Sequence, residues 1–325
     1  MDIRTIQEYL HPQMLRVGAI MDQALRSDIA LLDSTNALLR SRPGKMIRPS
    51  LALLVANACG TPTEDSYRYA AAAELLHNAT LLHDDVVDGA QERRGQPTVA
   101  KLLNGRAAVL MGDYWLVKCL DLIMDTGHSA EVLRIFSRTL SHLTEGELLQ
   151  MEKAGKGDTL QAHYERIILG KTASLFEAST LSAALSVDAP QETVEAMGRM
   201  GRALGMAFQI KDDIMDYSAA RQALGKPVGI DLLEQKITQP LLCALDGVSP
   251  EQAADIRSKV ARIAKEPALA ARVRDFVLAQ DGVAKAALVM DSFIGQALRC
   301  LESLPESAEK SYLKDLANFI AEREV

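Results

Sequence analysis

The sequence lacks the features of a secreted, membrane-spanning or nucleic-acid-binding protein. Its four cysteines are widely spaced without a CxxC pair, which argues against a disulfide framework. A formal net charge of −7 argues against a nucleic-acid partner and gives no attraction to anionic lipid. The first residues lack the basic start and apolar run of a signal peptide, and the most apolar window contains Lys171 and Glu177, so a transmembrane segment is not expected. We therefore expect a cytoplasmic protein.

Proline and alternating β-branched runs are scarce as well. No proline occurs between Pro97 and Pro190, and apolar residues in that interval recur every three or four positions, as in amphipathic helices. Glycine and proline gather in short segments such as "RPGKMIRP" and "ERRGQPT", which are typical of connections between helices. No internal repeat, low-complexity tract or long linker interrupts the chain. The pattern predicts an all-α fold in which residues 1–325 form a single domain, a large bundle of long helices.

Three aspartates stand within five positions in the segment "HDDVVD" (residues 83–88), at the end of an apolar helical stretch. At about 100° per residue, Asp84 and Asp88 lie about 40° apart and one turn from each other, and His77 and Thr80 share their face. Two carboxylates about 4 Å apart repel each other by roughly 4 kcal/mol at an effective dielectric constant near 20. The dipole at the C-terminal end of a helix also disfavours anions. A solvated surface would relieve this repulsion, and so would a bound cation.

A second acidic cluster favours the cation. The segment "FQIKDDIMD" repeats the D-D-x-x-D spacing with Asp212, Asp213 and Asp216, again at the end of an apolar helical stretch. Two helices that are otherwise typical of a core, each with a row of carboxylates, suggest two walls of one central cavity. Mg²⁺ prefers hard oxygen ligands and binds through one or two carboxylates, waters and substrate phosphates. The two clusters therefore predict Mg²⁺ ions that hold a polyphosphate.

A phosphate ligand also requires cations at the same cavity. The candidates are Arg93 and Arg94 after the first cluster, Lys45 and Arg48 in "GKMIRP", Lys171 in "GKT" and Lys226 in "GKPVGID". Each of them alone would be typical of a solvated surface, but their positions beside the aspartates favour binding. "GKT" is not a phosphate-binding loop of the P-loop type, because Glu165 stands where that motif needs a glycine and no strand precedes it.

These motifs resemble, in kind and in order, those of the trans-polyprenyl diphosphate synthases, a family of all-α head-to-tail isoprenyl transferases. The resemblance extends from about residue 40 to about residue 240, and "YLKDLANFIAERE" is similar to the family's final segment. It implies the isoprenoid synthase fold, with helices around a central cavity. It also implies a Mg²⁺-dependent condensation of isopentenyl diphosphate with an allylic diphosphate, up to three ions with bound diphosphate, and a homodimer. One departure is that Pro43 and Met46 replace a glycine and an arginine of the family pattern.

The resemblance also implies a role for each candidate residue. Those expected to bind Mg²⁺ are Asp84, Asp88, Asp212, Asp213 and Asp216, with Asp85 as a supporting catalytic residue. Those expected to hold isopentenyl diphosphate are Lys45, Arg48, His77 and Arg94. Those expected on the allylic diphosphate are Arg93, Lys171, Thr172, Gln209 and Lys226, with Lys236 as a further candidate. The ring of Phe208 would either stabilise the allylic carbocation or pack between helices.

The product length is expected to depend on the turn before the first acidic motif. Relatives with short products have aromatic residues four or five positions before the first aspartate, where this chain has Thr80 and Ala79. Small residues there, together with a compact DDxxD motif, favour a long product, with octaprenyl diphosphate as the central expectation. Such a product would serve as a quinone side chain and be passed to the membrane.

Several alternatives stay open. The chain could be a geranylgeranyl diphosphate synthase or the catalytic subunit of a two-chain synthase. A class I terpene cyclase shares the fold but does not call for Lys45, Arg48 and Arg94. An HD-type metal phosphohydrolase would use His77 and the pair His83–Asp84, but it would leave "DDIMD" without a role.

Overall fold

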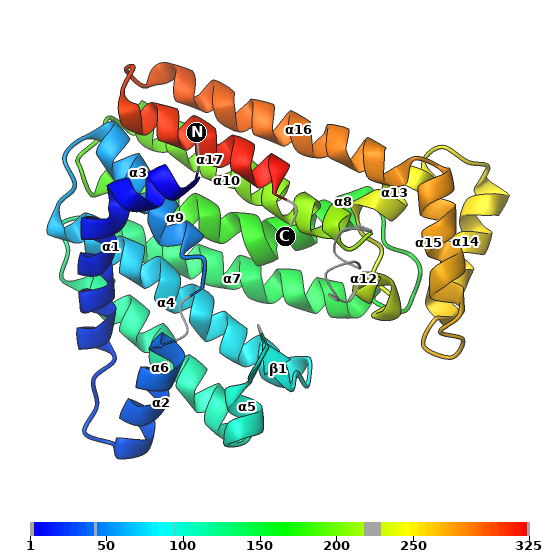
Figure 1. The fold of residues 1–325 in the computed structure, drawn as a ribbon, viewed down its shortest axis with the longest axis horizontal. Coiled ribbons are helices and arrows are strands. Elements are labelled where there is room, and N and C mark those ends of the chain that lie inside the picture. The colour runs from blue at the N-terminus through cyan, green and yellow to red at the C-terminus, as the bar shows by residue number, and fades with distance from the viewer. Residues whose placement is uncertain (1–2, 42–43, 94, 218–228, 324–325) are drawn as a thin grey trace. The chain divides into compact units, whose positions relative to one another are not determined.

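The computed structural model describes residues 3–41, 44–93, 95–217 and 229–323. These residues are almost entirely helical, and their only strands form a two-residue antiparallel pair (Figure 1). In chain order the elements are α1 (Ile3–Ala24), α2 (Ala30–Arg40), α3 (Ile47–Cys59), α4 (Glu64–Val87), β1 (Glu92–Arg93), β2 (Gln96–Pro97), α5 (Val99–Leu102), α6 (Gly105–Met124), α7 (Ser129–Lys153), α8 (Gln161–Ile168), the π-helix η1 (Leu169–Ala173), α9 (Ser174–Leu185), α10 (Gln191–Met215), α12 (Ile230–Leu233), α13 (Gln239–Leu245), α14 (Pro250–Arg262), α15 (Leu269–Ala279), α16 (Gly282–Cys300), the 3₁₀ turn η2 (Leu301–Ser303) and α17 (Ala308–Glu322). The predicted all-α fold is confirmed.

The helices form two compact units. The first unit comprises Met1–Ser137, Ala178–Met197 and Leu304–Leu313, and the second comprises Arg138–Glu177, Gly198–Ser303 and Lys314–Val325. No helix of the described ranges is both long enough and apolar enough to cross a membrane. The single domain expected over residues 1–325 stays a prediction.

Helix α4 is the centre of the first unit. Every residue from Tyr69 to Leu76 is buried, and the alanines from Ala70 to Ala73 have no exposed surface. A helix that is apolar on all sides must be surrounded by others. Helix α4 packs most extensively against α6 and also contacts α1 and α3 (Figure 1). The small alanine side chains allow these neighbours to approach the α4 backbone closely, which explains the lack of a single apolar face.

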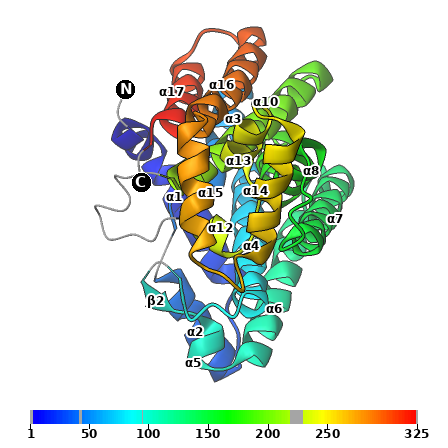
Figure 2. The same cartoon turned by 90° about the vertical axis from the view of Figure 1, so that its right-hand side faces the viewer.

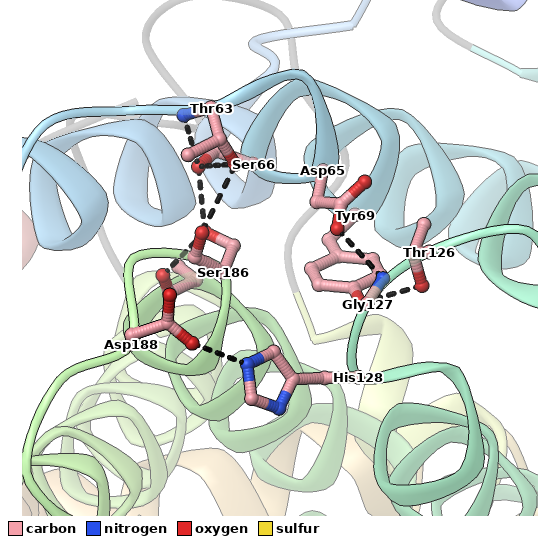
Figure 3. Close-up of polar contacts among 10 residues, drawn as sticks. Thr63, Asp65, Ser66, Tyr69, Thr126, Gly127, His128, Ser186 and Asp188 are labelled. Atoms are coloured by element: carbon pink, nitrogen blue, oxygen red, sulfur yellow. Dashed lines mark hydrogen bonds and ion pairs between the residues drawn. The ribbon is translucent and has the colours of Figure 1, made fainter.

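The N-terminal end of α4 is fixed by hydroxyl groups. Thr63 N donates a hydrogen bond to Ser66 Oγ at 3.0 Å, and Thr63 Oγ1 donates to the carbonyl of Ser186 at 3.0 Å. The hydroxyls of Ser66 and Ser186 lie 2.6 Å apart (Figure 3). The loop that follows α9 is held in turn by a 2.8 Å contact between His128 and Asp188. These bonds satisfy backbone groups that the first helical turn leaves without partners.

The segment after α6 is bound to the same helix one turn further along. Gly127 N donates to Asp65 Oδ2 at 2.9 Å, and Tyr69 Oη donates to Thr126 Oγ1 at 2.6 Å (Figure 3). Tyr69 is fully buried, so its hydroxyl needs such a partner. The start of α4 is therefore held from two sides, which fixes the direction of the whole helix.

The second unit contains α13 to α16. Helices α14 and α15 lie side by side (Figure 2), α13 packs on α16, and α15 also contacts α16. Val273 of α15 and Val260 of α14 have no exposed surface. Gly282, at the start of α16, has no space for a side chain, because an added Cβ would lie 2.4 Å from the carbonyl oxygen of Pro240. Close packing at this glycine holds α16 against α13.

Candidate active site

The first acidic motif ends helix α4, as the sequence predicted. Asp84 lies in the last turn of the helix and Asp88 is its C-cap residue, with Asp88 N donating to the Asp84 carbonyl at 2.8 Å. The side chain of Asp84 is half-buried and that of Asp88 is exposed, whereas Asp85 is only 5% exposed. Because α4 is continuous, Thr80, Asp84 and Asp88 follow one another at intervals of one turn. Two accessible carboxylates on one face are suited to a cation.

Arg93 lies beside this motif and binds its middle aspartate. The Arg93 guanidinium, on strand β1, donates through Nε to Asp85 Oδ1 at 2.7 Å. Asp85 is buried, so the ion pair compensates a charge that would otherwise be costly there. The Arg93 side chain is itself 36% exposed. Arg93 is thus anchored to the motif and still accessible, which is compatible with its predicted contact to a diphosphate. Arg94 lies outside the described residues.

The residues expected to limit product length lie in the preceding turns of α4. Ala79 is 1% exposed, and Thr80 is half-buried with its hydroxyl donating to the His77 carbonyl at 2.8 Å. The side chain of His77 is also half-buried. The helix therefore carries small side chains at the two positions that lie four and five residues before Asp84.

Lys45 and Arg48 flank the start of α3. Lys45 is exposed, and Arg48 is half-buried in the first turn of the helix. Between them, Met46 adopts a left-handed conformation with φ of 51°. This conformation is uncommon for a residue with a long side chain and marks local strain. The strained turn sets the direction in which the chain enters α3 with both cations.

The second acidic motif ends helix α10 in the second unit, and its first carboxylate is paired. Asp212 Oδ1 accepts a 2.8 Å hydrogen bond from Arg323 Nη2, and the same nitrogen donates to the Phe208 carbonyl at 2.9 Å. The guanidinium of Arg323 also covers the Phe208 ring, with 3.8 Å between its central carbon and the ring centroid. Phe176 contacts the ring at a centroid distance of 5.4 Å. Phe208 is therefore a packing residue.

The second carboxylate of the motif, Asp213, is buried in a chain of hydrogen bonds. Tyr164 Oη donates to Asp213 Oδ2 at 2.5 Å, and Gln209 Nε2 donates to Asp213 Oδ1 at 3.1 Å. The hydroxyl of Thr172 donates to Gln209 Oε1 at 2.7 Å. Two predicted residues, Thr172 and Gln209, thus meet a third, Asp213. Tyr164 was not identified from the sequence.

Asp216 is buried and caps the short helix α12. Its two carboxylate oxygens accept hydrogen bonds from the backbone nitrogens of Ile230 at 3.2 Å and Asp231 at 3.1 Å. Its carbonyl accepts from Gly229 at 2.9 Å. Capping of a helix N-terminus is a structural role typical of aspartate. The predicted role of Asp216 as a metal ligand stays a prediction, and Asp216 also fixes the chain that follows residue 228.

Lys171 and Thr172 lie in the π-helix η1, inserted between α8 and α9. Turns of this kind occur mostly as single insertions in α-helices, often at functional sites. The segment packs closely on α7, since a Cβ on Gly170 would lie 2.4 Å from the His142 carbonyl oxygen. Lys171 forms an ion pair with Glu147 of α7. "GKT" lies in the interval whose periodicity predicts helices, but the sequence does not predict the π turn.

A cavity of about 160 Å³ joins these parts of the second unit. Among the residues that line it are Tyr164, Lys171, Gln209, Asp213, Asp231 and Lys236. Three predicted residues from two motifs, Lys171 of "GKT" and Gln209 and Asp213 of "FQIKDDIMD", thus line one space, together with the further candidate Lys236. Lysines beside carboxylates and amides are suited to a negatively charged ligand with its metal ion.

The carboxylates around this cavity are under electrostatic strain. Burial and the nearby Asp231 raise the pKa of Asp213 well above its usual range. Burial and the neighbouring Asp216 raise the pKa of Asp231 to about 6. Burial and the Asp213 carboxylate also raise the pKa of Tyr164. Desolvated carboxylates that repel one another favour a nearby cation.

The carboxylate oxygens of the two acidic motifs suit Mg²⁺, which needs few protein ligands, better than a metal ion whose ligands all come from the protein. Within the described ranges, no three His, Cys, Asp or Glu side chains are arranged to hold a metal ion by themselves. Mg²⁺ commonly takes one or two carboxylates and completes its shell with waters and substrate phosphates. Asp84 and Asp88, one turn apart on α4, match that pattern, as does Asp212 at 39% side-chain exposure. Each of these acidic motifs therefore suits Mg²⁺ that arrives with a diphosphate.

Several site residues were not predicted from the sequence, and two predicted residues, Arg94 and Lys226, lie outside the described residues. Glu147, Tyr164 and Arg323 reach the site from helices or segments far away in the sequence, so no local spacing pointed to them. Asp231 is the last residue of the segment "GKPVGID" and could have been found there as a further acid. Whether the two acidic motifs share one cavity stays a prediction.

Comparison with known proteins agrees with these observations. The family model of the polyprenyl synthetases matches residues 30–277. Octaprenyl diphosphate synthase of Escherichia coli (strain K12) is 38% identical over 260 residues, which are 80% of this chain and 80% of that protein.

Two solved structures have the same fold. A decaprenyl diphosphate synthase from Rhodobacter capsulatus is 31% identical, with a TM-score of 0.92 and full coverage of both chains. A polyprenyl synthase from Caulobacter crescentus CB15, solved with calcium and isoprenyl diphosphate, is 31% identical with a TM-score of 0.90, covering 100% of this chain and 98% of that one. This chain therefore belongs to the polyprenyl synthetase family of prenyltransferases and has their isoprenoid synthase fold.

Proposed function

We propose that this protein condenses isopentenyl diphosphate head-to-tail onto an allylic diphosphate, farnesyl or geranylgeranyl, and releases a long all-trans polyprenyl diphosphate. Octaprenyl diphosphate is the expected product, for use as a quinone side chain. The observation that carries this proposal is the cavity in which Lys171 of "GKT" lies together with Gln209 and Asp213 of "FQIKDDIMD". Membership of the polyprenyl synthetase family supports the same reaction.

The acidic motifs would hold Mg²⁺ through Asp84, Asp88 and Asp212. When bound, the ions would neutralise charge on the leaving diphosphate as the allylic C–O bond breaks. Asp213, which is oriented by its hydrogen bonds to Tyr164 and Gln209, would contribute to the same Mg²⁺ binding. The calcium and isoprenyl diphosphate in the Caulobacter enzyme support a divalent ion beside this class of substrate.

The cations of the chain would bind the two diphosphates. Arg93 and Lys171 are each held by a carboxylate, Asp85 and Glu147, so they would meet the allylic diphosphate in a fixed orientation. Lys226 would act on the same group. Lys45, Arg48, His77 and Arg94 would orient isopentenyl diphosphate so that its double bond attacks the allylic carbocation. The condensation leaves a new carbocation, which loses a proton to form the product's double bond, and the departing diphosphate would accept that proton.

Gln209 and Thr172 would stabilise the allylic carbocation by the dipoles of their side chains. The hydrogen bonds of Gln209 fix its amide, since Nε2 donates to Asp213 and Oε1 accepts from Thr172. A preorganised oxygen dipole stabilises developing positive charge without reorganisation. Phe208 is left out of this role because Arg323 covers its ring.

A homodimer would use the exposed stripe of α6. Leu110, Val117 and Met124 are 60%, 53% and 59% exposed and recur every seven residues, so they lie on one face of the helix. A row of large apolar side chains of this kind is typical of a protein interface. A two-chain synthase would use the same stripe for a different partner. The cytoplasmic location stays a prediction.

Product analysis of the purified chain tests the proposal. The protein is incubated alone with farnesyl diphosphate, isopentenyl diphosphate and Mg²⁺, and the products are separated and identified by mass spectrometry. We expect products between hexaprenyl and decaprenyl diphosphate, centred on octaprenyl. Geranylgeranyl diphosphate as the end product would favour the short-chain alternative. Activity that requires a second chain would favour the two-chain synthase, and phosphate release without condensation would refute a prenyltransferase.

A further inference from the structure

Arg323 is bound to the last turns of helix α10 by three contacts. Its Nη2 lies 2.8 Å from Asp212 Oδ1 and 2.9 Å from the Phe208 carbonyl oxygen, and the guanidinium covers the Phe208 ring at 3.8 Å. Both hydrogen bonds and the ring contact involve residues one turn apart on the same helix. Arg323 is therefore held in one position relative to the Asp212 carboxylate.

The two partners differ in their access to solvent. The Arg323 side chain is 5% exposed, whereas that of Asp212 is 39% exposed. The guanidinium stays protonated at all relevant pH values. A permanent positive charge thus lies behind a carboxylate whose other side faces solvent. Any ion that approaches Asp212 meets an already compensated charge.

The other two carboxylates of the motif have different hydrogen-bond donors. Asp213 accepts from the neutral groups of Tyr164 and Gln209, and Asp216 accepts from backbone nitrogens at the start of α12. Neutral donors orient a carboxylate without cancelling its charge. Hydrogen bonding alone does not require a charged donor. The guanidinium of Arg323 therefore distinguishes Asp212 from the other two carboxylates of the motif.

We propose that Arg323 is a positioning residue that makes metal binding at Asp212 depend on a diphosphate ligand. This inference rests on the proposed function, in which Asp212 is a metal ligand. With Arg323 in place, a bare divalent cation finds a neutral ion pair and is repelled by the guanidinium. A diphosphate adds negative charge to the same place, so the metal then binds as a metal–diphosphate complex. The arrangement would suppress metal uptake in the absence of substrate.

Metal binding to the full-length protein tests this proposal without relying on turnover. Mn²⁺ affinity is measured by electron paramagnetic resonance, with and without inorganic pyrophosphate, for the unaltered protein and for Arg323→Met. We expect Arg323→Met to bind free Mn²⁺ about tenfold more tightly, because a neighbouring positive charge is removed. With pyrophosphate the gain should be much smaller. Asp212→Asn in the same variant should abolish the gain, which assigns it to this carboxylate.

Two further variants separate charge from packing. Arg323→Lys keeps the charge and should retain the weak affinity for free Mn²⁺. Arg202→Met is the matched control. Arg202 lies on α10, as Asp212 does, but it pairs with Glu177, so its removal should leave the Mn²⁺ affinity unchanged. Should Arg323→Met fail to fold, Arg323→Gln removes the charge and keeps a donor for the Phe208 carbonyl.

The outcomes distinguish this proposal from the proposed function. If the unaltered protein condenses its substrates and binds Mn²⁺ with pyrophosphate, but neutral variants at Arg323 leave free Mn²⁺ affinity unchanged or weaker, the role of Arg323 is wrong. If the unaltered protein neither condenses substrates nor binds Mn²⁺ with pyrophosphate, the proposed function fails as well.

Discussion

Tyr164 and Asp213 form a 2.5 Å hydrogen bond inside the second unit, between α8 and the acidic end of α10. Tyr164 is 3% exposed and Asp213 is 3% exposed, so water does not replace the bond easily. The bond connects a residue without an obvious motif to an acid of the second DDxxD motif. It also places the phenol at the wall of the cavity that contains Lys171.

Removal of this phenol should weaken both stability and catalysis. Tyr164→Phe leaves a buried carboxylate with one donor fewer, which typically costs about 1–3 kcal/mol of unfolding free energy. We expect that loss in urea unfolding, together with a lower kcat for condensation. Tyr114→Phe is the matched control, because that hydroxyl makes a long 3.3 Å bond at the surface. Equal stability of the two variants would show that the buried bond contributes little.

The glycine of the π turn should not tolerate a side chain. Gly170→Ala would place Cβ 2.4 Å from the His142 carbonyl oxygen and 3.1 Å from Gly146, so the two segments must separate. Overpacking of this kind costs about 1–3 kcal/mol, and displacement of Lys171 should lower kcat. Gly295→Ala is the control, since the nearest atom to its Cβ is the flexible end of Arg299 at 3.5 Å. A fully active Gly170→Ala enzyme would show that the π turn is not needed.

A bulky residue at position 79 should shorten the product. Ala79 is buried in the turn that precedes Asp84. If the growing chain passes this turn, as we propose, a tyrosine there would fill the space that the chain requires. We expect Ala79→Tyr to consume isopentenyl diphosphate but to release products several isoprene units shorter, as measured by mass spectrometry. An unchanged product length, with substrate consumption retained, would show that the chain does not pass this turn.

Two of the cysteines, Cys59 and Cys119, should react slowly with alkylating reagents. Burial raises the pKa of Cys59 to about 11, and it raises the pKa of the fully buried Cys119 as well. Because the thiolate is the nucleophile, alkylation of Cys59 at pH 8 should be about two orders of magnitude slower than that of a free cysteine of pKa about 8.5. The rate should rise with pH until about 11, and Cys119 should react only after unfolding. Mass spectrometry of peptides from timed labelling measures both rates, and rapid native labelling of Cys119 would contradict its burial.

The sequence was sufficient to predict features that depend on local spacing. The helix ending at Val87 and its carboxylates one turn apart follow from periodicity, and "GKT" was correctly assigned to a helical region. The fold class was recognisable because the motifs occur in a family-specific order. These are properties of neighbouring residues, for which helical geometry is nearly fixed.

Features that depend on distant packing could not be predicted. The π turn requires the contact of Gly170 with α7, and nothing near "GKT" announces it. Arg323 reaches Asp212 over a separation of 111 residues. Asp216 has the spacing of a metal ligand, yet its oxygens cap α12, whose position depends on tertiary structure. Sequence reasoning named the acids but could not determine which partner each one meets.

Helix α4 is held by hydrogen bonds at its N-terminal end and carries the first acidic motif at its C-terminal end. Asp84 follows Thr63 by a distance of roughly 30 Å at about 1.5 Å per residue. A small tilt where the hydroxyls of Ser66 and Ser186 meet would therefore be magnified into a large sideways shift of the acidic tip. Substitutions at these two serines would therefore lower activity in the same way as substitutions in the acidic motif, although the serines lie at the opposite end of the helix.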